Sequence, residues 1–265
     1  EEKQWWPFGY YEKEKSETGK EKKYPELKDA KLGFAVASHV LEMKEGERNV
    51  QLSFQFSSAL SLIKVSELIY NIEIWVSGEK EWLGPYSPEQ ELKDENGVIL
   101  YSTQHSGKVI KLAFQIPPND GAVVGYNPKI HGENFDTTDP VCRILLKTEN
   151  PAGYQLYAHV SKNEISELKI DVNVKGIKEI ELENDVGILN ADKPFYPFVT
   201  QPVKGSSFYI NYPELFEKNW SKLNLNLKWK NTPDNFKDWY FAYRKDMIEM
   251  VTPLIYFKSV SFFTF

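Results

Sequence analysis

The chain has 265 residues, of which 41% are hydrophobic and 14% aromatic, so it can bury a core in one large or two ordinary domains. Its net charge is -6, and no cluster of basic residues is free of interleaved glutamates, which argues against a nucleic-acid surface. No apolar run approaches the roughly 20 residues of a membrane-spanning helix.

The first 30 residues are charged and contain many turn formers, so we predict a solvated arm over residues 1–30. Aromatic side chains near its start suggest an anchored first stretch: Trp5, Trp6, Phe8, Tyr10 and Tyr11. The chain begins at Glu1 without a methionine and ends on the apolar run Val260–Phe265. We therefore expect a fragment of a longer protein, or a last strand that a neighbour completes.

Residues 31–162 contain a first series of predicted strands. Residues 48–56 alternate polar and apolar side chains, which is typical of a half-buried antiparallel strand. The other strands predicted here are residues 32–38, 72–76, 109–116 and 141–146, with a short helix over 60–69. Pro117 and Pro118 end one strand, and the pair Asn150-Pro151 closes another.

Residues 163–265 contain a second series. Strands are predicted over residues 167–175, 177–183, 207–210 and 223–229, with a helical turn over 213–218. A short C-terminal helix is predicted from Thr232 and Pro233, with an aromatic face at Phe236, Trp239, Tyr240 and Tyr243. The fold class that follows is all-β with a few short helices. We expect an antiparallel β-sandwich, with two sandwich-like modules in tandem over 31–162 and 163–265.

The segment Lys193–Ile210 is the most distinctive part of the second module. Pro194, Pro197 and Pro202 alternate with aromatic residues, and a Gly-Ser-Ser turn then leads into an aromatic strand. Because proline fixes φ and disfavours helix at the residue before it, we predict a stiff, extended strap (residues 193–206). A solvated linker does not need Phe195, Tyr196 and Phe198, whereas a strap that docks on another surface does.

Residues with catalytic or metal-binding chemistry give no constellation. The four histidines are not spaced as zinc ligands, and we interpret them as loop or surface imidazoles: His39, His105, His131 and His159. Cys142, the only cysteine, reads as a buried core thiol. The loop over residues 131–139 collects oxygen ligands without the order of a calcium loop, so Asx-turn chemistry explains it better than a cation does. We predict no catalytic residue, cofactor or metal.

Two alternative functions remain open. A carbohydrate-binding module would use exposed aromatic side chains, for which Trp75 and Trp82 are candidates, although core or interface packing is the preferred interpretation. A glycosidase-like domain would need two carboxylates across a cleft, and with 38 acidic residues the sequence cannot place such a pair.

Several segments, in order, resemble baseplate J-like proteins of extracellular contractile injection systems, which are phage-tail-like particles. The resemblance extends from about residue 32 to 243 and is carried by residues 32–38, 41–48, 171–177, 183–187, 194–210 and 214–243. Two positions depart from the family pattern: Val199-Thr200 stand where Gly-Pro tends to follow the second phenylalanine of the strap, and His39 stands where proline tends to occur.

The resemblance implies a structural, non-enzymatic wedge component of a baseplate. It would act by protein–protein contacts with other baseplate, sheath or hub proteins, in multiple copies, without nucleic acid or a membrane span. Such a particle is assembled in the bacterial cytoplasm and is then released or attached to a membrane. The expected interface residues are large aromatic side chains: Phe195, Tyr196, Phe198, Phe208, Tyr209, Trp229, Phe262 and Phe263.

Overall fold

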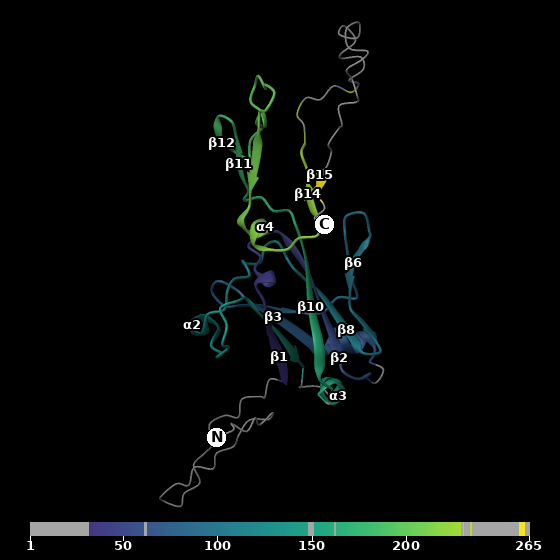
Figure 1. Cartoon of the computed structure of the whole chain (residues 1–265). Coiled ribbons are helices and arrows are strands. Elements are labelled where there is room, and N and C mark those ends of the chain that lie inside the picture. The colour runs from purple at the N-terminus through teal and green to yellow at the C-terminus, as the bar shows by residue number, and fades with distance from the viewer. Residues whose placement is uncertain are drawn as a thin grey trace, which may run out of the picture. The chain divides into compact units, whose positions relative to one another are not determined.

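The computed structural model describes residues 32–60, 63–147, 151–161, 163–228, 230, 234 and 260–262. The chain divides into two units, Glu1–Ile177 and Lys178–Phe265 (Figure 1). The sequence predicts a division after residue 162, but β10 (Ile165–Lys175) pairs along its length with β2 (Glu47–Phe56) and so belongs to the first unit. The boundary between the units therefore lies later in the chain than predicted. The loop before β10 does not separate the units, because β10 joins the sheet of the first unit by pairing with β2.

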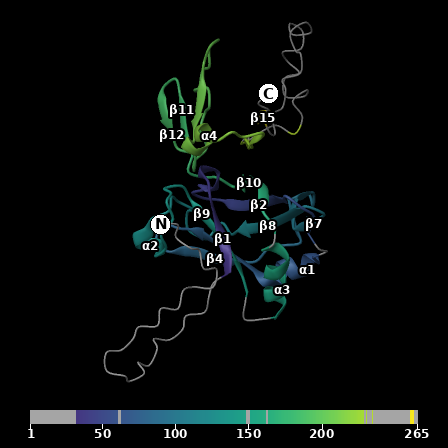
Figure 2. The same cartoon turned by 60° about the horizontal axis from the view of Figure 1, so that its bottom comes forward.

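The first unit is an antiparallel β-sandwich. One sheet has the order β1-β9-β3-β4, and the other has the order β10-β2-β8-β7 (Figure 2). The first sheet comprises β1 (Leu32–Ala37), β9 (Val141–Leu146), β3 (Ile72–Ser77) and β4 (Trp82–Tyr86). The second comprises β10, β2, β8 (Val109–Ile116) and β7 (Gln104–Ser106). The predicted β-sandwich class is confirmed.

Alternation of apolar and polar residues explains how the two sheets meet. In β2, Val50, Leu52 and Phe54 face inward and are at most 3% exposed. Each has a large apolar neighbour on β8, since Val50 lies beside Phe114, Leu52 beside Leu112 and Phe54 beside Ile110. Residues on opposite positions of neighbouring strands share a face of the sheet, so these rows form one continuous apolar layer. The other sheet contributes the buried Ile74, Val76, Cys142 and Ile144 to the same core.

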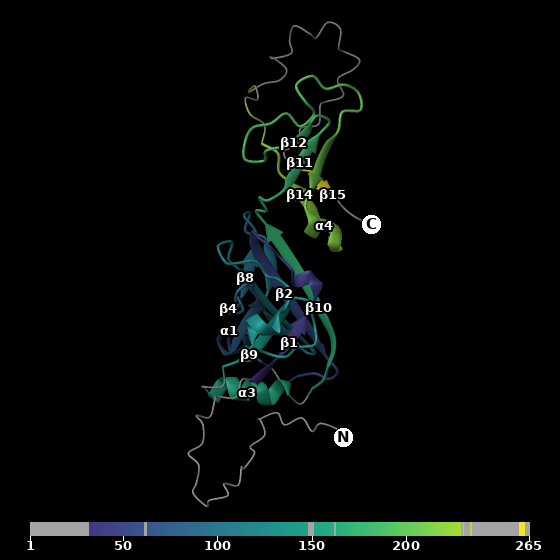
Figure 3. The ribbon, with the colours of Figure 1, turned by 90° about the vertical axis from the view of Figure 1, so that its left-hand side faces the viewer.

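Short elements close the sandwich. A hairpin of β5 (Glu91–Lys93) and β6 (Ile99–Ser102) packs beside β2 and β8, and the Gln51 amide donates to the Ser102 carbonyl at 3.4 Å. The helical elements of this unit are η1 (His39–Leu41), α1 (Val65–Asn71), α2 (Pro128–His131) and α3 (Pro151–Val160). Figure 3 shows β10 as the long strand along one side of this unit, with α3 near its beginning. Helix α3 was not predicted, although Pro151 at its first position is a usual start signal.

A buried arginine joins the beginning of β2 to the loop that follows β8. Arg48 occupies an inward-facing position and is 0% exposed. Its guanidinium donates to the carbonyls of Gly121 at 2.8 Å, Pro117 at 2.7 Å and Asp120 at 2.9 Å, and also to Met43 at 3.4 Å. The Asp120 carboxylate in turn accepts from the Tyr86 hydroxyl at 2.6 Å. Burial, and then this hydrogen bond, raise the pKa of Tyr86.

The second unit is smaller in its described part. It contains a three-stranded antiparallel sheet in the order β12-β11-β13 and a two-stranded pair, β14-β15. The elements are β11 (Glu181–Asn184), β12 (Gly187–Leu189), β13 (Phe208–Asn211), α4 (Pro213–Glu217), β14 (Leu223–Leu225) and β15 (Val260–Phe262). Apart from residue 234, the predicted helix from residue 232 lies outside the described residues, as does the whole predicted N-terminal arm.

We expect the substitution Arg48→Met to lower the free energy of unfolding by about 3 kcal/mol, because it leaves several buried carbonyls without a donor. Equilibrium unfolding in urea measures this change. The matched control is Lys111→Met on β8, at a half-buried position that lies opposite Ser53. Equal stability of the two variants would contradict the assigned role of Arg48.

Candidate functional site

The strap of the second unit packs on the sheet beside it. The rings of Phe195 and Phe198 lie 5.8 Å and 6.3 Å from the ring of Phe208 on β13, the first stacked and the second edge-on. Aromatic pairs at these distances stabilise a fold beyond their buried area. Two of the predicted interface residues, Phe195 and Phe208, are therefore half-buried inside their own unit. This contact gives the strap a structural role.

The strap is not extended throughout, contrary to the prediction. The Val199 amide donates to the Tyr196 carbonyl at 3.4 Å, so a turn interrupts the strap there. The Ser206 amide donates to the Val203 carbonyl at 3.0 Å, at the place where the sequence predicts the Gly-Ser-Ser turn. Val199 has φ +63°, in the left-handed region that favours glycine. The baseplate J-like pattern tends to have glycine at this place, and the sequence therefore departs from it where the backbone turns. Proline alone does not predict this reversal.

Asn184 connects the strap to the sheet. This side chain is 4% exposed, and its amide donates to the Tyr196 carbonyl at 3.0 Å while its oxygen accepts from the Val186 amide at 3.0 Å. The second contact closes the tight turn between β11 and β12, where the pair Asn184–Gly187 ends the ladder. The Asp185 carboxylate accepts from the Ser207 amide at 3.0 Å. One short hairpin turn therefore holds both ends of the strap.

Cross-strand register assigns the two faces of the three-stranded sheet. Leu182 lies opposite Leu189 on one side and Ile210 on the other, and it is 4% exposed. The next residue along β11, Glu183, lies opposite Ile188 and Tyr209, so these three form a row on the opposite face. Ile188 is 88% exposed and Tyr209 is 58% exposed.

The predicted interface residues therefore divide into three groups. Tyr196, Phe198 and Tyr209 are exposed, although Phe198 also contacts Phe208 with its ring, whereas Phe195 and Phe208 are half-buried and pack on each other. Trp229 and Phe263 lie outside the described residues, and the backbone of Phe262 pairs with Leu223. The sequence interpretation missed Ile188 and Val186, both more than 80% exposed. The alternation Glu-Leu-Glu-Asn before the turn was the signal that could have placed them.

The tryptophans considered for sugar binding surround an arginine of the chain itself. The Arg143 guanidinium lies 3.8 Å from the centroid of the Trp82 ring and 5.8 Å from that of Trp75, and it pairs with the Glu133 carboxylate. Trp82 also donates to the His131 carbonyl at 2.9 Å. This cation–π contact occupies faces that a sugar would need, which favours the packing interpretation.

His131 is buried, so its interpretation as a loop or surface imidazole is wrong. It is 5% exposed, and its Nε2 lies 3.0 Å from the Gly78 carbonyl oxygen. Its ring also packs on Trp82 and Tyr126, with centroids 4.8 Å and 5.4 Å away. The neighbouring oxygen-rich loop uses Glu133 to bind Arg143, and the described residues contain no group of three or more histidine, cysteine or acidic side chains placed to hold a metal.

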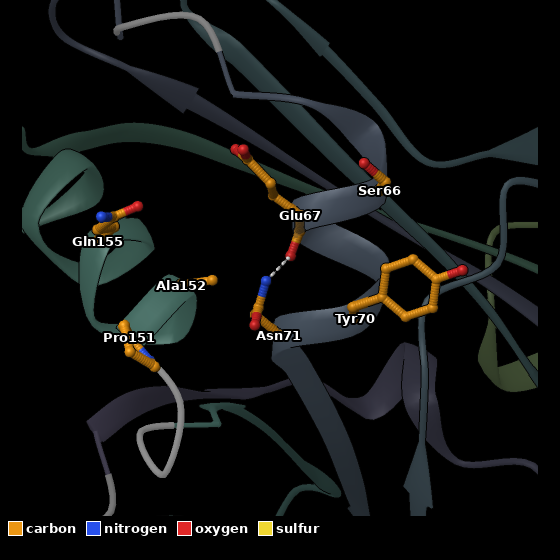
Figure 4. Close-up of a pocket in the computed structure, with 7 residues that line it drawn as sticks. All are labelled: Ser66, Glu67, Tyr70, Asn71, Pro151, Ala152 and Gln155. Carbon is orange, nitrogen blue, oxygen red and sulfur yellow. Dashed lines mark hydrogen bonds between the residues drawn. The ribbon is translucent and has the colours of Figure 1, made fainter.

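A groove between α1 and α3 is the hollow that the first unit presents in Figure 4, with a volume of about 600 Å³. Ser66, Glu67, Tyr70 and Asn71 line it from α1, and Pro151, Ala152 and Gln155 line it from α3. Glu67 is the only carboxylic acid among these lining residues, and it accepts from the Lys64 amide at 3.2 Å. The groove therefore lacks the pair of carboxylates that glycoside hydrolysis requires.

These features define a β-rich protein that exposes aromatic and apolar side chains on the strap and the three-stranded sheet of its second unit. Residues 140–254 match the model of the family described as "Baseplate protein PVC11-like". This part of the chain is therefore similar to a PVC11-like baseplate protein domain, and the matched segment spans the end of the first unit and most of the second.

No curated protein matches the chain. Among the described residues, no helix is both long and apolar enough to cross a membrane. The family match supports the baseplate class that the sequence resemblance suggested, and it includes the strap together with the whole three-stranded sheet.

We expect Val199→Gly to stabilise the second unit by about 0.5 to 1 kcal/mol, because glycine removes the left-handed penalty but costs chain entropy on folding. Thermal or urea unfolding measures it. Thr200→Gly is the matched control, since no positive φ is recorded at its position. If both glycine variants destabilise the protein equally, the left-handed turn at Val199 is not formed.

The prediction that Cys142 is a buried core thiol is confirmed, since it is 0% exposed and burial raises its pKa to about 12. At pH 8 a thiol with that pKa is about one part in 10⁴ thiolate, which is the reactive form. We expect no reaction of the folded protein with Ellman's reagent at pH 8, and reaction of one thiol per chain in guanidinium. Rapid labelling of the folded protein would contradict the buried position.

Proposed function

We propose that the chain is a structural wedge component of the baseplate of a PVC-like contractile injection particle. The observation that supports this most is the family match over residues 140–254. Two further features agree with it: the unit built around the strap keeps large apolar side chains exposed, and the groove between α1 and α3 lacks a catalytic pair of carboxylates. The baseplate class implies a non-enzymatic role.

The proposed mechanism is rigid presentation of a contact surface. In the first unit, two facing sheets bury a shared core, which gives a stable support. In the second, the strap covers one part of β13, while Ile188 and Tyr209 remain exposed on the other face of the sheet. Exposed apolar side chains that form a contiguous patch often mark an interaction site.

The proposed partners are other baseplate, sheath or hub proteins, in several copies of a symmetric particle. We also propose, as the resemblance implies, that the chain is part of a longer J-like protein. Its assembly would take place in the bacterial cytoplasm, and the particle would then be released or attached to a membrane.

A deletion and complementation experiment tests the proposed function. Deleting the coding region of this chain should yield particles or tubes without a complete baseplate, and expression of the full chain should restore it, as seen by electron microscopy. Complete baseplates in the deletion strain, or the absence of the chain from purified particles, would contradict the proposal.

A further inference from the structure

The row Ile188–Glu183–Tyr209, hereafter the β11 row, crosses all three strands of the second unit's sheet. Glu183 is the direct partner of Ile188 on β12 and of Tyr209 on β13, so the carboxylate lies between an aliphatic and an aromatic side chain. Directly opposed side chains have Cβ atoms about 5 Å apart, which makes the row a single contact patch. Ile188 is 88% exposed and Tyr209 is 58% exposed, although both are large and apolar in character.

The opposite face of the same sheet shows what these strands do when they pack inside the unit. There, Leu182 is 4% exposed and Asn184 is 4% exposed, and Phe208 contacts the rings of the strap. The strap therefore covers one face only. In the described part of the chain, neither β12 nor β13 pairs with a further strand on its outer side. The β11 row therefore lies on a face of this small sheet that neither the strap nor any other described strand covers.

Glu183 differs from the acidic residues around it. Glu181 accepts from the Asn211 amide at 2.7 Å, and Asp185 accepts from the Ser207 amide at 3.0 Å. The Glu183 carboxylate makes no hydrogen bond or ion pair with any other residue that the structure describes. The three strands contain no lysine or arginine, so the carboxylate has no cation beside it on the sheet.

We propose that the β11 row binds an arginine on an apolar surface of another baseplate protein, an inference that rests on the proposed function. A guanidinium can stack on a tyrosine ring and donate two hydrogen bonds to a carboxylate, whereas a lysine ammonium cannot do both. Ile188 supplies the apolar contact beside it. The first unit uses this chemistry internally, where the Arg143 guanidinium lies over Trp82 and pairs with Glu133.

Charge excludes a second copy of the chain bound face to face through the same row. A two-fold contact centred on the row would place two Glu183 carboxylates near each other without a cation from the sheet. Like charges held together in a desolvated interface oppose association. The partner must therefore bring the positive charge, and its surface is complementary rather than identical.

Binding of the purified full chain to baseplate assemblies isolated from a strain that lacks it tests the inference. Variants Tyr209→Ser and Ile188→Ser should each weaken the affinity about tenfold or more, since exposed residues that become buried hot spots have effects of this size. Glu183→Gln should weaken binding at low salt and should bind with less dependence on salt than the original chain, because it removes the charge from the pair.

Matched controls separate this surface from general effects. Tyr70→Ser removes a tyrosine that is 72% exposed in the first unit, and Glu217→Gln neutralises an exposed carboxylate on α4. Both should bind like the original chain, and all variants should keep the original unfolding midpoint.

If the original chain itself does not bind the assemblies, the proposed function fails. If it binds and the Tyr209 and Ile188 variants bind equally well, only the β11 row is excluded. Unchanged binding and salt dependence of Glu183→Gln would overturn the assigned arginine.

Discussion

The burial of one face of β2 is the constraint on which the first unit depends. Its inward row of Val50, Leu52 and Phe54 meets β8 on one side and β10 on the other, and these strands come from distant parts of the sequence. A shift of one residue in either register would turn the polar row, which includes Ser53 and Gln55, into the core. The position of β10, and with it the place where the first unit ends, follows from this single strand.

The two units bury their apolar side chains in different ways. The first has two facing sheets and a shared core, as a sandwich requires. The second has a three-stranded sheet whose covered face is held by aromatic rings of the strap. A strap can replace a second sheet because the large rings of Phe195 and Phe198 cover much apolar surface with only two residues. The strap does not cover the other face of that sheet, where Ile188 and Tyr209 are exposed, and the proposed contact with a baseplate partner uses this face.

Much of the fold could be predicted from alternation, and much of the candidate site could not. Residues 48–56 and 109–116 alternate so regularly that their strands and facing directions follow from the sequence alone. Helix α3 was missed because its ten residues give only a weak amphipathic pattern, and the Pro151 signal was interpreted as the end of a strand. The burial of His131 was missed because it depends on rings from β4 and from the loop before α2, which only the fold brings together.

The strap shows the same limit on a smaller scale. Its aromatic and proline residues predicted that it packs on a surface, and the contacts with Phe208 agree. Its path was not predicted, since the turn at Val199 needs a backbone conformation that valine disfavours and that local propensity alone cannot indicate. The β11 row depends on which residues of the three strands lie opposite one another. It could therefore be recognised only after the hairpin turn at Asp185 and Val186 had been placed.

Arg48 has a consequence for the conditions under which the first unit holds together. Its guanidinium stays charged at any ordinary pH, and the carbonyls of Pro117, Asp120 and Gly121 do not titrate. Because the group is buried, dissolved ions screen these contacts little. The exposed pair Lys175–Glu95 lacks this protection, since salt weakens the attraction between two solvated charges. High salt would therefore weaken this surface contact and leave the loop after β8 anchored.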